Sequence, residues 1–502
     1  MMAPIDWHAR AKKIDLKVNN FIDGGYVESA NSDEKKIVKR SPRDGATLYE
    51  YISGSNDDMN HAVNKAKQSF EKGVWRDKSI HERKAVLQAL ADLVEKNTEE
   101  FALYECLDVG KPIANALAED IPLTVATLRN TAEGADKLLS PSGTDGSNFA
   151  YQLRKPIGVV GSIIGWNYPL WMAAIKAAPA LVMGNSLVLK PSEFTSLSAC
   201  RFAELAVEAG VPPGVFNVVN GSGSTVGKTL AHHPDINLLS FTGSSTTGKQ
   251  LMISAGQSNM KRLMLECGGK SPYIAFDDCP QDLDYIAADI VSSAFPNQGE
   301  RCIAGTRLLI QEGLKERLLP KIIEQTSQLI PQDPLNPNTA FGALINEAHM
   351  KKVLAYIESG EKEGATLVYG GNRIQVAGCE QGYYIEPAIF DNVSPQQAIA
   401  KEEIFGPVLS VFTFKDEQEA IKLANDSCYG LAAFVATENL SRAHRLAASL
   451  DAGLICISGT STPLGGDVDL SIEGHKQSGY GFEHGMSGLA SYTISSAVNI
   501  SF

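Results

Sequence analysis

Residues 157–189 read IGVVGSIIGWNYPLWMAAIKAAPALVMGNSLVL, and this stretch decides the fold class. The apolar run from Ile157 to Ile164 is rich in β-branched residues, which predicts a buried strand. A helical stretch near Leu170 to Met183 follows it, and Ser186 to Leu189 predicts a second strand. Two strands joined through a helix normally pair in parallel, so this unit predicts an α/β protein.

The alternation of strand and helix continues through the chain. We therefore expect mostly parallel sheets with helices on both faces. The first series continues with a helix near Ser196 to Ala209, a strand at Val215 to Val219, a short helix from Thr225 and a strand at Leu238 to Thr242. After Glu266 come helices near Leu283 to Ser293, His349 to Gly360, Glu417 to Asn425 and Ser441 to Leu450, and strands at Thr306 to Gln311 and Gly430 to Ala436.

Length and composition agree with a soluble enzyme of more than one domain. A chain of 502 residues is too long for one compact core, so two large domains and a smaller element are expected. Charged residues make up 21% and hydrophobic residues 44%, which is ordinary for a globular enzyme. The net charge of −13 argues against a nucleic-acid partner, because phosphate backbones attract clustered Lys and Arg.

The chain carries no recognisable membrane or export signal. No apolar run approaches the length of a membrane span, and the first eight residues lack the apolar core of a secretory signal. The eight cysteines are scattered without a CxxC pair, so neither a zinc site nor a disulfide scaffold is indicated. We expect a cytoplasmic protein with no membrane partner and no metal.

Two segments place a reactive side chain beside glycine. LECGGK at residues 265–270 sets Glu266 before a Gly pair, and NQGERCIAG at residues 297–305 sets Cys302 shortly after Gly299. A thiol and a carboxylate suit covalent carbonyl chemistry, in which the thiolate attacks and the carboxylate later activates water. Neither segment is specific alone, because most cysteines are small buried hydrophobic residues.

Together with four further motifs, these segments resemble the NAD(P)-dependent aldehyde dehydrogenase superfamily over nearly the whole chain. The resemblance implies a Rossmann-like coenzyme domain (1–137 and 157–267), an α/β catalytic domain (268–475) and a small β oligomerisation element (138–156 and 486–502). The further motifs are GWNYPL at 165–170, LKPSE at 189–193, FTGSSTTG at 241–248 and EEIFGP at 402–407.

The resemblance assigns four catalytic residues. It implies that Cys302 attacks the aldehyde, that Glu266 activates the water which cleaves the thioester, and that Lys176 supports this network. The side-chain amide of Asn167 and the backbone N–H of Cys302 match the oxyanion hole of the family.

Two glycine-rich segments compete for the cofactor phosphates. Gly221, Gly223 and Gly227 fit a dinucleotide fingerprint, whereas residues 241–248 add hydroxyl donors to a helix N-terminus. The resemblance places the second segment, with Phe241, Gly243 and Ser244, against the pyrophosphate and places Gly223 beside the adenine.

The remaining cofactor contacts follow from the other motifs. Glu193, beside Lys190, would accept hydrogen bonds from ribose hydroxyls and repel an added 2′-phosphate, so we expect NAD. A surface ion pair is the alternative reading of these two residues. Glu403 and Phe405 are expected at the nicotinamide ribose, although a Glu-Glu pair is ordinarily a solvated helix turn. Trp166, Ser192 and Gly268 complete the set.

The substrate wall departs from the family pattern. Tyr168, Trp171 and Met172 are expected to contact substrate, whereas Gly165, Ile175 and Pro296 replace the more usual Pro, Trp and an aromatic residue, which predicts a roomier tunnel. Glu300 and Glu473 are expected to add negative charge near it, unless they are solvated or paired with Arg301. The loop from Gly459 to Gly474 does not match the family and is not interpretable by analogy.

Within the superfamily the chain most resembles γ-glutamyl-γ-aminobutyraldehyde dehydrogenases of polyamine catabolism. This similarity rests on residues 259–262, 268–271 and 302–309, which flank the reaction centre. It implies an ω-amino or γ-glutamylamino aldehyde as substrate, with a general aliphatic aldehyde as the alternative. A CoA-acylating enzyme would not need Glu266, and a non-catalytic relative would be expected to lose Cys302, Asn167 or Glu266.

Two segments predict self-association. Asn148 to Arg154 and Ala490 to Phe502 have the pattern of extended strands, and uncovered strand edges favour pairing with another chain. In the family these segments build the oligomerisation sheet, so we expect a homo-oligomer, a dimer or tetramer. A disordered tail is the alternative.

Overall fold

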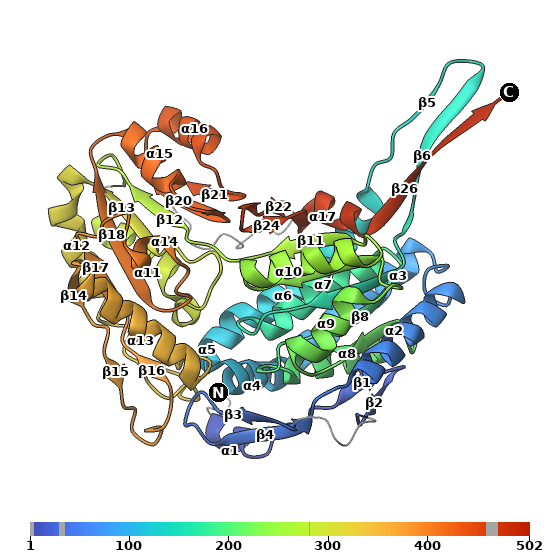
Figure 1. The fold of residues 1–502 in the computed structure, drawn as a ribbon, viewed down its shortest axis with the longest axis horizontal. Helices are drawn as coiled ribbons and strands as arrows, with labels where there is room; N and C mark the ends of the chain where they lie inside the picture. Colours follow the sequence, from blue (N-terminus) through green and yellow to red (C-terminus); the bar gives the residue numbers. More distant parts are fainter. Residues whose placement is uncertain (1–4, 30–35, 281, 458–469) are drawn as a thin grey trace.

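The computed structural model describes residues 5–29, 36–280, 282–457 and 470–502. The strands form two large sheets, and a three-stranded sheet projects away from them as an arm (Figure 1). The predicted α/β fold class is therefore confirmed.

The first sheet has eight strands in the order β2-β1-β9-β8-β7-β10-β11-β24. Its five inner strands are parallel, and antiparallel strands close both edges. The strands are β1 (Asn20–Ile22), β2 (Gly25–Val27), β7 (Val159–Ile163), β8 (Ser186–Lys190), β9 (Phe216–Val218), β10 (Leu238–Thr242), β11 (Arg262–Glu266) and β24 (Gly479–Tyr480).

Helices cover both faces of this sheet, as alternate residues of its strands require. Val160 and Leu187 belong to one core with helices α3, α4, α6, α7 and α8, whereas Val159 and Val188 belong to another with α2, α9 and α10. The helices are α2 (Asn56–Glu71), α3 (Ile80–Lys96), α4 (Thr98–Val109), α6 (Ile121–Gly134), α7 (Pro169–Val182), α8 (Leu197–Ala209), α9 (Lys228–His232) and α10 (Ser245–Gln257).

The second sheet has seven strands in the order β14-β17-β18-β13-β12-β20-β21, all parallel except β14. Helices α11 and α12 pack on one face, and α13, α15 and α16 pack on the other. The strands are β12 (Pro272–Ala275), β13 (Arg307–Gln311), β14 (Thr366–Tyr369), β17 (Ala388–Asp391), β18 (Val408–Phe414), β20 (Ala432–Ala436) and β21 (Leu454–Ile457). The helices are α11 (Leu283–Ala294), α12 (Glu312–Thr326), α13 (Glu347–Lys362), α15 (Glu417–Asn425) and α16 (Leu440–Ser449).

The arm consists of β5 (Ser142–Thr144), β6 (Asn148–Pro156) and β26 (Thr493–Ser501). β26 pairs antiparallel with β6 over its full length, so chain segments more than 300 residues apart form one ribbon. Four small sheets pair β3 (Lys36–Arg40) with β4 (Thr47–Ile52), β15 (Arg373–Ile374) with β16 (Tyr384–Ile385), β19 (Tyr429–Gly430) with β23 (His475–Lys476), and β22 (Ile472–Glu473) with β25 (Phe482–Glu483).

Local sequence fixes many helix ends. Ser55 and Ser79 open α2 and α3 with capping boxes, and left-handed Gly110 and Gly210 close α4 and α8.

The remaining α-helices are α1 (Trp7–Ala11), α5 (Ile113–Asn115), α14 (Ala398–Lys401) and α17 (Gly485–Ser491), and a π-helical turn covers Ala116–Asp120.

Three predicted boundaries are wrong. The C-terminal strand begins at Thr493 and not at Ala490, because residues 485–491 form α17, which buries Leu489 in the core. The helix expected from Thr225 begins as a π-helical turn over Gly223–Gly227, which Ser222 caps. The strand expected from Gly430 splits into β19 and β20, which pair with different partners.

Candidate active site

The predicted cofactor segments of the first half collect at one edge of the first sheet. Strands β8, β7, β10 and β11 run in parallel, and their registers align Lys190 with Ile163 and Thr242 with Glu266. The segments that contain Trp166, Lys190, Ser244 and Gly268 each follow one of these strands. Ligands bind at the carboxyl ends of strands in open α/β sheets, so this edge is the candidate site.

A cavity of about 70 Å³ lies where this edge meets the loop that carries Cys302. Its wall is mainly apolar, with a few polar groups among the residues that line it. Six residues singled out from the sequence line it: Asn167, Tyr168, Trp171, Met172, Glu266 and Cys302. The other lining residues are Ile175, Thr242, Arg301, Ile303, Leu431, Leu454, Ile472, Glu483 and His484.

The loop before Cys302 is held in an unusual conformation. Asn297 and Gln298 have φ of +51° and +59°, which is uncommon for residues other than Gly. The Asn297 side chain donates to the carbonyl oxygens of Asn167 at 3.1 Å and Glu300 at 3.2 Å. Asn167 Nδ2 donates to the same Glu300 oxygen at 2.9 Å. An amide has two N–H groups, so Asn167 keeps one for a ligand in the cavity that it lines.

Burial sets the protonation of the two reactive groups. It raises the pKa of the Cys302 thiol to about 12; the Glu266 and Glu403 carboxylates act in the same direction, and Arg301 opposes them. Burial also raises the pKa of Glu266 to about 8, against the effect of the Lys176 ammonium. At neutral pH the thiol therefore keeps its proton, and Glu266 becomes a carboxylate base as the pH rises through 8.

Lys176 lies behind the cavity wall. Its side chain is fully buried and ion-paired with Glu483, which does line the cavity. Burial lowers the pKa of Lys176, while the nearby Glu266 carboxylate favours its charged form. Glu266, Lys176 and Glu483 thus form one coupled buried group.

Four of the predicted cofactor residues, Trp166, Gly268, Glu403 and Phe405, lie close to one another near the cysteine loop. The Trp166 and Phe405 rings meet edge to face with centroids 5.2 Å apart. The backbone N–H of Gly269 donates to Glu403 Oε1 at 2.9 Å, and a Cβ on Gly268 would collide with the same carboxylate. Glu403 is thus fixed beside the Glu266 segment and does not extend into solvent.

The other predicted cofactor residues spread along the sheet edge. Lys190 Nζ contacts Glu193 Oε2 at 3.3 Å, and the Ser192 hydroxyl accepts from the N–H of Phe194. Ser244 caps the N-terminus of α10 and is exposed there. Gly223 lies farther away, in an exposed turn after β9, two strands from β7.

These features fit a dinucleotide. The exposed N-terminus of α10 suits a pyrophosphate, and Glu193, whose side chain is 33% exposed, suits ribose hydroxyls. Gly243 directly follows β10. A Cβ on Gly243 would lie 2.5 Å from the Phe241 ring and collide with it, so the close approach of this ring requires a glycine.

The sequence pattern of the family described as "Aldehyde dehydrogenase family" matches residues 26–498. The chain belongs to this family. The predicted family and enzyme class, an oxidoreductase that acts on aldehydes with a nicotinamide dinucleotide, are therefore confirmed.

Similar proteins cover nearly the full length of this aldehyde dehydrogenase. It is 43% identical to the NADP/NAD-dependent aldehyde dehydrogenase PuuC of Escherichia coli (strain K12), over 97% of this chain and 96% of the relative. Among solved structures, it matches the P. syringae indole-3-acetaldehyde dehydrogenase AldA, a mutant in complex with NAD⁺ and IAA, with a TM-score of 0.95, 45% identity and 99% coverage of both chains. The γ-glutamyl-γ-aminobutyraldehyde dehydrogenase of Burkholderia cenocepacia J2315 matches with a TM-score of 0.95, 41% identity and the same coverage, which confirms the predicted similarity to that group.

The expected negative charge in the cavity of the aldehyde dehydrogenase is wrong for Glu300. Its side chain is fully buried outside the cavity, where one carboxylate oxygen accepts from the N–H of Ile345 at 3.0 Å. Arg301 lines the cavity and contacts Glu119, not Glu300. Glu473 also lies outside the wall, although its neighbour Ile472 is part of it.

The predicted departures in the substrate wall have different outcomes. Ile175 lines the cavity, as expected for a substrate wall. Pro296 instead opens the turn before Asn297 and is not part of the wall, and neither is Gly165. In the divergent loop, residues 459–469 lie outside the described residues, and residues 470–474 supply Ile472 to the cavity.

Sequence reasoning missed Glu483 and His484, which follow the divergent loop. His484 has φ of +58° and ψ of 173°, a region that is essentially reserved for Gly, and its ring stacks on Trp171. No short motif marks either residue; a carboxylate and a histidine in a Gly-rich segment were the only signals.

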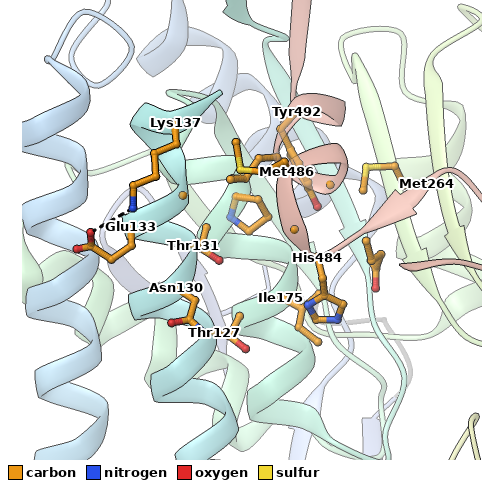
Figure 2. A pocket seen from close by; sticks show the side chains of 16 residues that line it. Thr127, Asn130, Thr131, Glu133, Lys137, Ile175, Met264, His484, Met486 and Tyr492 are labelled. Atoms are coloured by element: carbon orange, nitrogen blue, oxygen red, sulfur yellow. Dashed lines mark ion pairs between the residues drawn. The ribbon is translucent and has the colours of Figure 1, made fainter. Parts of the chain in front are cut away.

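A second cavity of about 240 Å³ adjoins the catalytic one. The two share Ile175, Glu483 and His484. In Figure 2, Ile175 and His484 lie at one side of the second cavity and the Glu133–Lys137 pair at the other. Helix α6 supplies the polar lining residues Thr127, Asn130 and Thr131.

Within the described ranges, no helix is long and apolar enough to cross a membrane. In the same part of the chain, no group of three or more His, Cys, Asp or Glu side chains is arranged to hold a metal ion.

Proposed function

We propose that this aldehyde dehydrogenase oxidises an ω-amino or γ-glutamylamino aldehyde of polyamine catabolism to its carboxylic acid, with NAD as cofactor. One observation carries the chemistry: a single cavity joins the Cys302 thiol, the Glu266 carboxyl and the Asn167 amide. Relatives named for γ-glutamyl-γ-aminobutyraldehyde and for aminoacetaldehyde support the substrate class.

Each residue has a defined role in the proposed reaction. The Cys302 thiol releases its proton to water, and the thiolate sulfur bonds to the aldehyde carbon. The carbonyl π bond opens to an oxyanion, which the Asn167 side chain and the Cys302 N–H stabilise. Bound NAD accepts the hydride, which leaves a thioester on Cys302. Glu266 then takes a proton from water, whose oxygen bonds to the acyl carbon; the C–S bond breaks and the acid leaves.

Lys176 and Glu483 act on Glu266 as positioning residues. The Lys176 ammonium favours the ionised form of Glu266, and Glu483 keeps that ammonium in place. Tyr168, Trp171 and Met172 form the proposed walls for the substrate chain.

NAD is proposed over NADP because of Glu193. Its carboxylate lies at the carboxyl edge of the sheet beside Lys190, where a 2′-phosphate would meet a like charge. Trp166, Ser192, Gly223, Phe241, Gly243, Ser244, Gly268, Glu403 and Phe405 are the other proposed cofactor contacts.

We also propose the domain division expected from the sequence, because each of the three domains centres on its own sheet. Residues 1–137 and 157–267 bind the coenzyme, 268–475 are catalytic, and 138–156 with 486–502 associate with other copies. The eight cysteines are free, which suits the reducing cytoplasm.

A general aliphatic aldehyde dehydrogenase is the second candidate, favoured by the mainly apolar wall. NADH formation with acetaldehyde, propionaldehyde, 3-aminopropanal, 4-aminobutanal and γ-glutamylated 4-aminobutanal separates the two. The polyamine reading requires the highest kcat/KM for the amino or γ-glutamylamino compounds. A preference for acetaldehyde, or a requirement for CoA, would contradict it.

A further inference from the structure

Arg301 places a positive charge in the wall of the catalytic cavity. The other charged wall residues have assigned partners or roles: Glu483 pairs with Lys176, and Glu266 is the proposed base. The cavity therefore offers a guanidinium to whatever part of the substrate lies near it.

The hydrogen-bonding capacity of this guanidinium is largely unused. Its closest ionic contact is Glu119 Oε1 at 3.5 Å, which is long for a charged pair, and Arg301 donates no hydrogen bond within the described chain. Glu119 Oε1 also faces the Tyr168 hydroxyl at 3.4 Å. A guanidinium carries five N–H donors, and those of Arg301 that bind no protein group are accessible from the cavity that it lines.

Two buried acidic residues behind Tyr168 each use one carboxylate oxygen on other partners and leave the second oxygen unpartnered. Asp120 is ion-paired with Lys111, and Glu105 accepts hydrogen bonds from Ser198 and the N–H of Leu170. The Lys111 ammonium lies 3.9 Å from the centre of the Tyr168 ring, which separates this buried group from the cavity that Tyr168 lines. The free donors of Arg301 are thus left for a ligand.

We propose that Arg301 binds a carboxylate on the tail of the aldehyde substrate. A carboxylate matches the planar guanidinium with two parallel hydrogen bonds, and the apolar walls around it strengthen the attraction. The inference rests on the proposed function and narrows it. A γ-glutamylamino aldehyde carries a carboxylate, whereas a free ω-amino aldehyde carries only a cation that Arg301 repels.

The test compares two pairs of aldehydes: the first differs in the terminal carboxylate alone, and the second differs in the whole γ-glutamyl group that carries it. The first pair is 4-oxobutanoate and butanal, and the second is γ-glutamylated 4-aminobutanal and free 4-aminobutanal. We expect the wild type to have a higher kcat/KM for the carboxylate-bearing aldehyde than for its partner in at least one pair. In Arg301→Gln that preference falls by roughly tenfold or more, mainly through KM, because a charged hydrogen bond is lost. Arg301→Lys should retain part of it, and Arg317→Gln, on the exposed face of α12, should keep it in full.

The ratio within a pair separates substrate binding from an effect on the thiol. Arg301 also lowers the pKa of Cys302, so its loss slows every substrate, whereas only a carboxylate site changes the ratio. The pH dependence of Cys302 alkylation by iodoacetamide measures the thiol effect separately. Equal losses for both members of each pair, or a wild type without a carboxylate preference, would overturn the carboxylate site. A wild type that oxidises none of the four aldehydes would overturn the proposed function itself.

Discussion

Cys302 and Glu266 line the same cavity, and burial raises the pKa of both side chains. The resemblance of the motifs to the aldehyde dehydrogenase family predicted which side chains meet, whereas each motif alone is not specific. The motifs could not predict all the charges around that pair, because Glu483 and Glu119, which contacts Arg301, lie far from Cys302 in the sequence. Charge in a cavity depends on such long-range packing, which explains why the expected position of Glu300 was wrong.

The coupling of Lys176 to Glu266 predicts a shift in pH dependence. Glu266 acts as a carboxylate, so thioester hydrolysis should slow as the pH falls through about 8. In Lys176→Met the carboxylate loses a favourable ammonium, its pKa rises further, and the fall should begin at higher pH. Acid release in single-turnover experiments at a series of pH values measures this. Lys176→Met combined with Glu483→Gln controls for the orphaned Glu483 charge, and an unshifted profile in both variants would refute the coupling.

Glu193 predicts the cofactor preference. Repulsion of a 2′-phosphate by roughly 1.4 kcal/mol or more corresponds to at least tenfold in favour of NAD. Glu193→Gln keeps the shape of the side chain and removes its charge. It should lower the ratio of kcat/KM for NAD to kcat/KM for NADP. A wild type that prefers NADP, or a variant with an unchanged ratio, would show that Glu193 does not distinguish the ribose of NAD from the 2′-phosphorylated ribose of NADP.

At the scale of elements, hydrophobic periodicity located most helices and strands of the two large sheets to within a few residues. It failed where packing overrides the local pattern: residues 490–492 look extended in sequence, yet Leu489 and Tyr492 are buried at the end of α17. The contact between Gly269 and the cysteine loop is also a tertiary feature. A Cβ on Gly269 would collide with the carbonyl oxygen of Cys302.

Gly269→Ala tests whether the loop must sit this closely. The added methyl group pushes on backbone atoms, at a cost of about 1–3 kcal/mol, so we expect Cys302 to move and kcat to fall at least tenfold. Gly313→Ala is the matched control, because a Cβ there has open space near the start of α12. Steady-state kinetics measure kcat, and thermal melts measure the stability of both variants. A near-normal kcat in Gly269→Ala would argue against a fixed loop.

At the scale of the whole molecule, the arm of β5, β6 and β26 extends far from the two large sheets (Figure 1). Phe149 and Ile500 are paired in its register and partly exposed, at 37% and 45%. An isolated ribbon with exposed apolar side chains is poorly stable in water, so we expect other copies of the chain to cover it.

Negative charges introduced on the arm should therefore weaken its association with other copies of the chain. Phe149→Glu combined with Ile500→Glu is expected to give a smaller species than the wild type in sedimentation velocity. Ile330→Glu, on an exposed residue away from the arm, should sediment like the wild type. If the wild type is already a monomer, or if the double variant sediments unchanged, the arm does not mediate association.

The central claim is that Cys302 carries the acyl group and Glu266 releases it. Intact-mass and peptide-mass analysis of Glu266→Gln, mixed with NAD⁺ and γ-glutamylated 4-aminobutanal and quenched within one turnover, tests both halves. The account predicts one acyl group on the peptide that contains Cys302, together with a matching burst of NADH, and neither signal in Cys302→Ala. A burst of NADH without an adduct, or an adduct that persists in Cys302→Ala, would contradict it.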